Sequence, residues 1–281
     1  RNFQLQSFNS GHLDQAAENI ALTDILYPND NNETGKRIRL KQEFLLVAAS
    51  LQDIVKEYKE HNENFDDFCD KVRIQINDTH PALAVVELYR LLNKQKGISP
   101  ETAWEMTKTT ISYTNHTVLR EALEEWEQHR IQSLLPRQYE ILEQLNLMLC
   151  NQVRKHYPDN EEKVRRMSIL EDGKVKMAHL AIFGSHKVNG VAALHSKIIK
   201  EQLFKDFHDM DPDKFTNVTN GITQRRWLLH CNPQLAKVIT EKIGDEWITN
   251  FSKISEFAQF SEDPATQNQL LEIKQENKQN L

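Results

Sequence analysis

The stretch GSHKVNGVA, residues 184–192, follows the apolar run MAHLAIF (177–183) and precedes the amphipathic run ALHSKIIKEQLF (193–204). This order predicts a strand over the apolar run, then a glycine-bracketed loop, then a helix. Open α/β sheets bind their ligands at such junctions, outside the carboxyl ends of the strands. The stretch therefore predicts an α/β fold and a candidate site within it.

The rest of the chain supports an α/β organisation that is rich in helix. Short apolar runs that end in polar residues predict strands at 71–77 and 111–117. The Asp172-Gly173 pair predicts a β-hairpin, and the polar segment 217–221 predicts a domain boundary. Helical spacing of apolar residues predicts helices over 40–61, 78–94, 101–110, 118–126, 134–157 and 231–244.

Composition limits the classes of protein to which the chain can belong. Its 281 residues carry a formal net charge of -6, which argues against a nucleic-acid partner because phosphate contacts need a basic surface. No apolar run approaches the ~20 residues of a membrane span, so we expect no membrane partner. Cys69, Cys150 and Cys231 are scattered, as in a cytoplasmic protein with reduced thiols. Because the chain begins without Met and ends in a charged helical run, we interpret it as a fragment.

Polar side chains gather where the predicted strands end. The segments are INDTHP (76–81), YTNHT (113–117), GSHKVNGV (184–191) and NVTNGITQRRW (217–227). If the strands are parallel neighbours, these segments meet at one edge of the sheet. Amide, imidazole and carboxylate groups suit a neutral polyol, whose hydroxyls donate and accept hydrogen bonds at once. This pattern favours a sugar-like ligand.

Other kinds of site have weaker support in the sequence. Asp78 and His80 with a later histidine could ligate a metal ion, but the spacings match no zinc signature, so we expect no metal. Residues 184–192 also lack the glycine motifs of phosphate loops and the G-x-S-x-G turn of a nucleophile. Gly184 and Gly190 either permit close packing alone or shape a binding loop, and both interpretations stay open.

On a set of specific segments, in family order and across nearly its whole length, the chain resembles the glycogen, starch and maltodextrin (α-glucan) phosphorylases. The segments are LYPNDN (26–31), IRLKQEF (38–44), INDTHPALA (76–84), SYTNHTVL (112–119), LLPRQ (134–138), GSHKVNGVAALHS (184–196) and FTNVTNGITQRRWL (215–228).

The resemblance implies a two-domain GT-B glycosyltransferase architecture with Rossmann-like sheets flanked by helices. Residues 1–219 would form the later part of the N-terminal, glucan-side domain. Residues 220–281 would begin the C-terminal, cofactor-side domain.

The implied activity is that of an α-1,4-glucan phosphorylase, in which orthophosphate releases the terminal glucose of a glucan as glucose 1-phosphate. Such enzymes hold pyridoxal 5′-phosphate as a Schiff base, and the phosphate of this cofactor serves in proton transfer. The lysine that would carry the cofactor lies outside this chain, so we expect the fragment itself to be inactive. Family members are commonly cytoplasmic homodimers.

Matching motifs imply roles for particular residues. His116 resembles the histidine that bonds the glucose 6-hydroxyl, Asn220 its partner there, and Val191 the apolar wall beside them. Asp78 and His80 resemble residues that line the cleft for neighbouring glucosyl units. The alternative is that Asp78 or Thr79 only caps the following helix, and both roles can hold.

Two further assignments concern a loop and the cofactor. Asn31 lies in the family's mobile gate loop and resembles a contact to a sugar hydroxyl, while Asp30 would move away before phosphate binds. A turn without function is an equal alternative for both. Trp227 resembles an aromatic beside the cofactor, and burial in a core is the competing interpretation.

Departures from the family pattern affect neighbouring positions. Asn32 and Glu33 stand where relatives often carry a stacking aromatic, which suggests a different glucan affinity or chain-length preference. Gln224 and Arg120 replace common prolines, which puts the local backbone geometry in question.

Two functions from other classes remain open at this point. One is a non-catalytic glucan-binding module that retains the cleft and lacks the cofactor. The other is a metal-dependent hydrolase that uses Asp78, His80 and His116.

Overall fold

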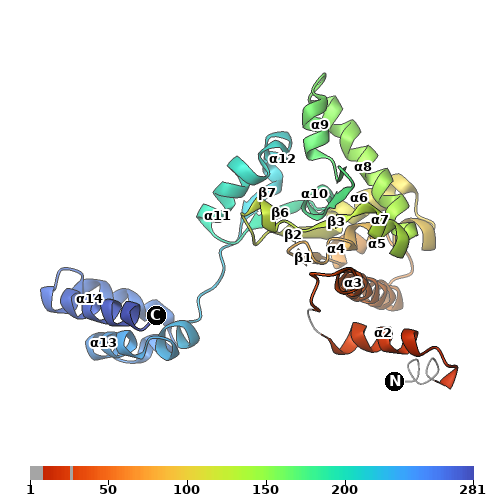
Figure 1. The fold of residues 1–281 in the computed structure, drawn as a ribbon. Helices are drawn as coiled ribbons and strands as arrows, with labels where there is room; N and C mark the ends of the chain where they lie inside the picture. The colour runs from red at the N-terminus through yellow and green to blue at the C-terminus, as the bar shows by residue number, and fades with distance from the viewer. Residues whose placement is uncertain (1–8, 26–27) are drawn as a thin grey trace. The chain divides into compact units, whose positions relative to one another are not determined.

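The computed structural model describes residues 9–25 and 28–281, which fold as two compact units. The first unit runs to Thr219, and the second comprises Asn220–Leu281. In Figure 1 the first unit is a sheet with helices around it, and the second is a group of helices.

The elements follow one another along the chain, and their labels are those of Figure 1. In the first unit they are α2 (Leu13–Asp24), α3 (Glu33–His61), α4 (Phe68–Lys71), β1 (Ile74–Asn77), α5 (Ala84–Arg90), η1 (Leu91–Gln95), α6 (Pro100–Thr110), β2 (Ile111–Thr114), η2 (Arg120–Ala122), β3 (Glu125–Glu127), α7 (Gln128–Leu134), α8 (Pro136–His156), α9 (Glu161–Met167), β4 (Leu170–Glu171), β5 (Lys174–Lys176), α10 (Met177–Phe183), β6 (Lys187–Gly190), α11 (Ala193–Ile198), η3 (Ile199–Leu203), α12 (Lys205–Met210), η4 (Pro212–Lys214) and β7 (Phe215–Asn217). In the second unit they are η5 (Arg225–His230), α13 (Pro233–Ile243), η6 (Glu246–Ile248), η7 (Phe251–Phe260) and α14 (Pro264–Gln279).

A four-stranded, all-parallel sheet in the order β1-β2-β6-β7 organises the first unit. One row across the sheet consists of Ile76, Tyr113, Val188 and Phe215, each at most 5% exposed. Because successive strand residues point to opposite faces, the side chains of the next row point to the other face of the sheet. The predicted strands at 71–77 and 111–117 are confirmed, as is the expectation of parallel neighbours.

The apolar run 177–183 is a helix, α10, and the prediction of a strand there is wrong. Six of its seven residues are buried, and a run that is apolar on all sides fits a buried helix as well as a buried strand. Its one polar residue, His179, bonds through Nδ1 to the Ser168 carbonyl (2.9 Å). Burial lowers the pKa of His179 to about 4, which keeps the ring neutral inside the core.

The predicted loop over residues 184–192 contains a strand, β6, and the alternation of burial along Lys187–Gly190 is that of a strand. Residues 118–126 were expected to be helical. They form only the short turn η2 and then β3, which pairs with β5 in a second, antiparallel sheet. Pairing with a distant strand has overridden the local helical pattern. The side chain of Arg120 donates to the Gln202 carbonyl (3.0 Å).

The hairpin predicted at Asp172-Gly173 is confirmed, since β4 and β5 pair antiparallel around it. Both turn residues have positive φ, 48° at Asp172 and 75° at Gly173, as a two-residue hairpin turn requires. Across residues 9–25 and 28–281, the structure contains no helix with the length and apolar character needed to cross a membrane.

The second unit has its own small core around the fully buried Trp247. The predicted helix over 231–244 is confirmed as α13, which Asn232 caps by accepting from the backbone N–H of Leu235 (3.2 Å). Gly244 ends this helix with a φ of 77°.

Candidate functional site

The carboxyl ends of the parallel strands form one polar edge. In the strand register Asn77 lies beside Thr114, which lies beside Asn189. Nε2 of Gln75 donates to the Thr114 hydroxyl (2.7 Å), which donates to Oδ1 of Asn189 (2.8 Å). The last polar segment joins the edge through Asn217, at the end of β7. These neutral groups bond to one another, so the sheet itself fixes their positions.

His116 lies at this edge, just beyond β2, and its side chain is exposed. Its Nε2 is 2.5 Å from Oδ1 of Asn77. The preceding residue, Asn115, donates from its backbone N–H to the Asn189 carbonyl (3.0 Å) and from its buried side chain to the Tyr113 hydroxyl (3.0 Å). The hydrogen bonds of Asn115 therefore fix the backbone next to His116. One nitrogen of the His116 ring already has a hydrogen-bonding partner.

Val191 follows the end of β6 and is held by helix α11. Its backbone N–H donates to Nδ1 of His195 (3.0 Å), so that nitrogen carries no hydrogen. On the same helix Ser196 donates to Oδ1 of Asn217 (2.6 Å). Helix α11 thereby joins the ends of β6 and β7 at the polar edge.

Close packing explains both glycines of the quoted stretch. A Cβ atom at Gly184 would lie 2.3 Å from Cγ1 of Val85, and one at Gly190 would lie 2.5 Å from Oγ of Ser196. Neither space accepts a side chain. Of the two interpretations left open by the sequence, the structure supports packing at both positions.

Asp78 and His80 follow β1 in a tight turn. Asp78 has a φ of 63°, its carboxylate accepts from the backbone N–H of Thr79 (2.6 Å), and its own N–H donates to the Thr114 carbonyl (2.9 Å). Helix α5 begins only at Ala84 and has no side-chain cap, so the interpretation of Asp78 or Thr79 as its cap is wrong. His80 is exposed.

Asp78 and His80 line one cleft, of about 580 Å³, together with Asp30 and Arg39. The residues 121–127 supply another part of its lining. In the part of the chain that the structure describes, no three His, Cys, Asp or Glu side chains are grouped as a metal ion would need.

Asn31 lies in a short loop that is folded onto the start of α3. Its backbone N–H donates to Oδ1 of Asn29 (3.0 Å), and its side chain is exposed. Asn32 caps α3 by accepting from the Gly35 N–H (2.9 Å), which gives this departure from the family's aromatic a structural use. Residues 26 and 27 of the same motif lie outside the described residues.

Asp30 of this loop belongs to a charged group that we call the Arg39 cluster: Asp30, Arg39, Glu43 and Glu124. Arg39 bonds Asp30 at 2.5 Å, Glu43 at 3.3 Å and Glu124 at 3.8 Å. Burial, with repulsion from the Glu124 carboxylate, raises the pKa of Glu43 to about 9. Glu43 therefore holds a proton at neutral pH, and Arg39 remains available to Asp30.

Sequence reasoning did not single out Asn77 within its polar segment, and it named Asp30 without the other members of the Arg39 cluster. The sequence does carry one signal for the cluster, because Glu43 lies among apolar residues in the helical pattern of 40–61. Asn77 carries no such signal, since its contact with His116 depends on the pairing of two strands.

Asn220 and Trp227 belong to the second unit. Asn220 is the first residue of this unit and is exposed. The Trp227 side chain is 68% exposed, so its interpretation as a core residue is wrong. Nearby, the buried Gln224 donates to the Ile248 carbonyl (2.8 Å), which gives this departure from proline a structural role.

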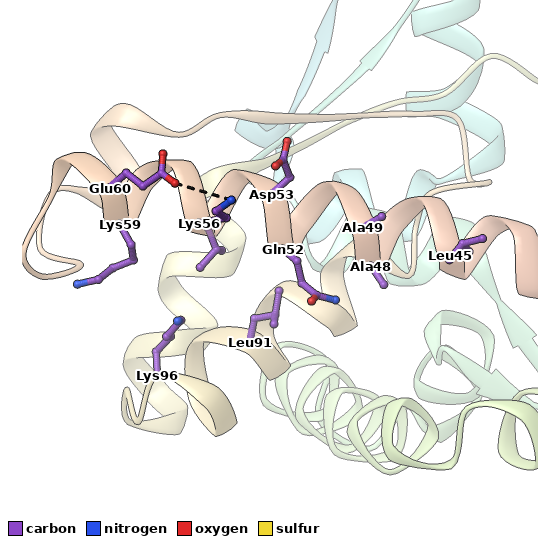
Figure 2. A pocket seen from close by; sticks show the side chains of 11 residues that line it. Leu45, Ala48, Ala49, Gln52, Asp53, Lys56, Lys59, Glu60, Leu91 and Lys96 are labelled. Carbon is purple, nitrogen blue, oxygen red and sulfur yellow. Dashed lines mark ion pairs between the residues drawn. The ribbon is translucent and has the colours of Figure 1, made fainter. Parts of the chain in front are cut away.

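A groove of about 820 Å³ runs along α3 and is lined by none of the site residues predicted from the sequence. Figure 2 shows its side chains, with Leu91 and Lys96 opposite α3 and an ion pair between Lys56 and Glu60 (3.8 Å). The groove therefore consists of the aliphatic parts of long side chains together with their charged ends, as is ordinary for the surface of an amphipathic helix.

The fold and the polar edge define a parallel α/β protein whose strand ends gather neutral hydrogen-bonding groups, as a polyol requires. The carbohydrate phosphorylase family matches residues 1–281. The chain therefore belongs to the carbohydrate phosphorylase family.

Its relatives include muscle-form glycogen phosphorylases from Ovis aries, 48% identical over 293 residues, and Homo sapiens, 47% identical over 293 residues. The brain form from Homo sapiens is 46% identical. These matches cover 98% of this chain, which spans only 34–35% of the length of the relatives.

Proposed function

We propose that the full-length protein carrying this sequence is an α-1,4-glucan phosphorylase, which releases glucose 1-phosphate from glycogen or maltodextrin with orthophosphate. The observation that carries the proposal is the polar edge, where His116 is held against Asn77 beside the Thr114–Asn189 pair. Membership of the carbohydrate phosphorylase family supports it.

In this proposal the neutral groups of the edge bind one glucosyl unit. His116 offers its free ring nitrogen to the 6-hydroxyl, Val191 forms an apolar wall, and Asn220 of the second unit completes the contact to that hydroxyl. Asp78 and His80 line the cleft for neighbouring glucosyl units, which their shared cleft supports. Asn31 bonds a sugar hydroxyl from the loop before α3, and its exposed side chain is free to do so.

The architecture proposed is GT-B, with residues 1–219 in the glucan-side domain and residues 220–281 at the start of the cofactor-side domain. The division of the chain into two compact units supports this boundary.

Pyridoxal 5′-phosphate is the cofactor proposed for the full-length protein, and when bound it supplies a phosphate group for proton transfer. Trp227 is the residue of this chain that would lie beside it. The exposed indole, in contrast to a core tryptophan, leaves a ring surface free for such a contact. We further propose a cytoplasmic homodimer, and the free thiols of Cys69, Cys150 and Cys231 suit a reducing compartment.

Assays of the full-length protein test the proposal. With maltodextrin and orthophosphate it should release glucose 1-phosphate, and omission of phosphate should abolish the product. His116→Ala should lower the rate more than about tenfold, because a hydrogen bond aimed at a substrate hydroxyl is lost. His61→Ala, at the exposed end of α3, is the matched control. Glucan binding without phosphorolysis would instead identify a glucan-binding module.

A further inference from the structure

We infer that Asn77 is a positioning residue that fixes which nitrogen of His116 carries the hydrogen, so that His116 accepts a hydrogen bond from the 6-hydroxyl of the bound glucosyl unit. This inference rests on the proposed function and assigns the direction of one of its contacts. It concerns a residue outside the sugar-contacting set.

The geometry at the polar edge carries the argument. Oδ1 of Asn77 is 2.5 Å from Nε2 of His116, and an amide oxygen can only accept. The hydrogen of the neutral ring must then be on Nε2, which leaves Nδ1 as a lone-pair acceptor. A hydroxyl that meets Nδ1 has to donate to it.

The position of Asn77 makes this contact durable. Asn77 is the last residue of β1 and lies in register with Thr114, two residues before His116. The backbones of the two strands are also joined beyond this pair, where the N–H of Asp78 donates to the Thr114 carbonyl (2.9 Å). Asn77 and His116 are thus brought together by sheet pairing rather than by flexible loops.

A site that accepts a hydrogen bond from the 6-hydroxyl favours sugars whose substituent at position 6 can donate one. A 6-deoxy sugar has no donor, and a 6-fluoro sugar has only a weak acceptor, so both should be discriminated against equally. If His116 instead donated through Nδ1, the fluoro sugar would be the better substrate of the two.

The experiment uses the full-length protein and transfer of glucosyl units to a maltodextrin primer, with phosphate release as the readout. Donors are glucose 1-phosphate and its 6-deoxy and 6-deoxy-6-fluoro analogues. Wild-type activity with glucose 1-phosphate tests the proposed function separately. Given that activity, the two analogues should have values of kcat/KM that agree within about twofold and lie about tenfold below glucose 1-phosphate.

Two variants of Asn77 test the positioning role. Asn77→Asp keeps an acceptor of the same shape and should retain kcat/KM for glucose 1-phosphate within about threefold. Asn77→Leu removes the acceptor and should lower kcat/KM for glucose 1-phosphate about tenfold, with no further loss on the 6-deoxy analogue.

The inference is overturned if Asn77→Leu lowers the rates on glucose 1-phosphate and the 6-deoxy analogue equally, which would indicate a structural role alone. It is also overturned if Asn77→Asp is as defective as Asn77→Leu, because Asn77 would then donate. A wild-type preference for the fluoro analogue over the deoxy analogue would contradict it as well.

Discussion

The polar edge of the sheet and the Arg39 cluster lie in the same unit and are stabilised by different interactions. The edge joins neutral groups, such as Thr114 and Asn189, whose bonds do not depend on pH. The cluster balances one guanidinium against several carboxyl groups, two of them largely buried. The comparison indicates that neutral groups stabilise the polar edge, whereas charged groups stabilise the loop before α3.

The largest effect is expected from Glu43→Gln. The native Glu43 carboxyl, with a pKa of about 9, keeps a proton that the unfolded chain releases near its ordinary value of 4.5. Wild-type stability therefore falls as pH rises from 4.5 to about 9, by at most about 1.4 kcal/mol per pH unit. Glutamine keeps the shape and has no such proton, so the variant should lose this slope.

Melting temperatures of the full-length protein between pH 5 and pH 9 check this prediction. The melting temperature of Glu43→Gln should rise steadily relative to that of the wild type as the pH increases. Glu121→Gln, which changes an exposed carboxyl, is the matched control and should follow the wild-type curve. Parallel curves for Glu43→Gln and the wild type would mean that Glu43 is ionised in the native protein.

The next effect is expected from Gly190→Ala, which tests the packing that supports the edge. The new methyl group would meet Oγ of Ser196 at 2.5 Å and the backbone Cα of Ser196 at 2.9 Å. Such overpacking costs about 1–3 kcal/mol, and it should displace Val191 and lower activity. Gly221→Ala, with open space around it, should change stability by less than about 0.5 kcal/mol. Equal melting temperatures for the two variants would disprove the packing argument.

A smaller effect is expected from Thr114→Val, which removes a hydroxyl and nearly preserves shape. Gln75 and Asn189 would each lose a partner, at a cost of about 1–2 kcal/mol. Because all the groups are neutral, the cost should be the same at pH 6 and pH 9. Thr109→Val, at an exposed helix position, is the control in the same denaturation series. If the loss of stability on Thr114→Val changed with pH, the contrast between a neutral polar edge and a charged Arg39 cluster would be wrong.

The smallest effect is expected from Asp30→Asn. The ion pair with Arg39 is partly exposed, with side chains 40% and 28% accessible, and pairs of this kind contribute less than about 1 kcal/mol. Its loss should be measurable at low ionic strength and should disappear near 1 M salt, where charges are screened within about 3 Å. A loss that persists in high salt would indicate that Asp30 acts through its backbone turn.

Much of the fold could be predicted from local pattern, and the exceptions have physical reasons. The strands ending at Asn77 and Thr114 were predictable because β-prone runs gave way abruptly to polar residues. The helix at 177–183 was not predictable, because an almost uniformly apolar run has neither the helical nor the strand periodicity of hydrophobic residues. Strand β6 was hidden by its glycine and asparagine, which are poor strand formers.

The site was predictable in its residue types and only partly in its contacts. Polar residues at strand ends indicated a shared edge once parallel pairing was assumed. The bond from Asn77 to His116 depends on strand register, which no local pattern specifies. The Glu43–Glu124 pair depends on the packing of segments that are far apart in the chain.

The glycine in the first turn of α3 has a consequence for how the preceding loop can be studied. A Cβ atom at Gly35 would lie 1.7 Å from the carbonyl oxygen of Asn29, so the present course of residues 29–32 exists only with a bare Cα there. Alanine at this position would leave the helix intact and forbid that course. One methyl group would thus displace the loop, and the effect of that displacement on stability and on activity would become directly measurable.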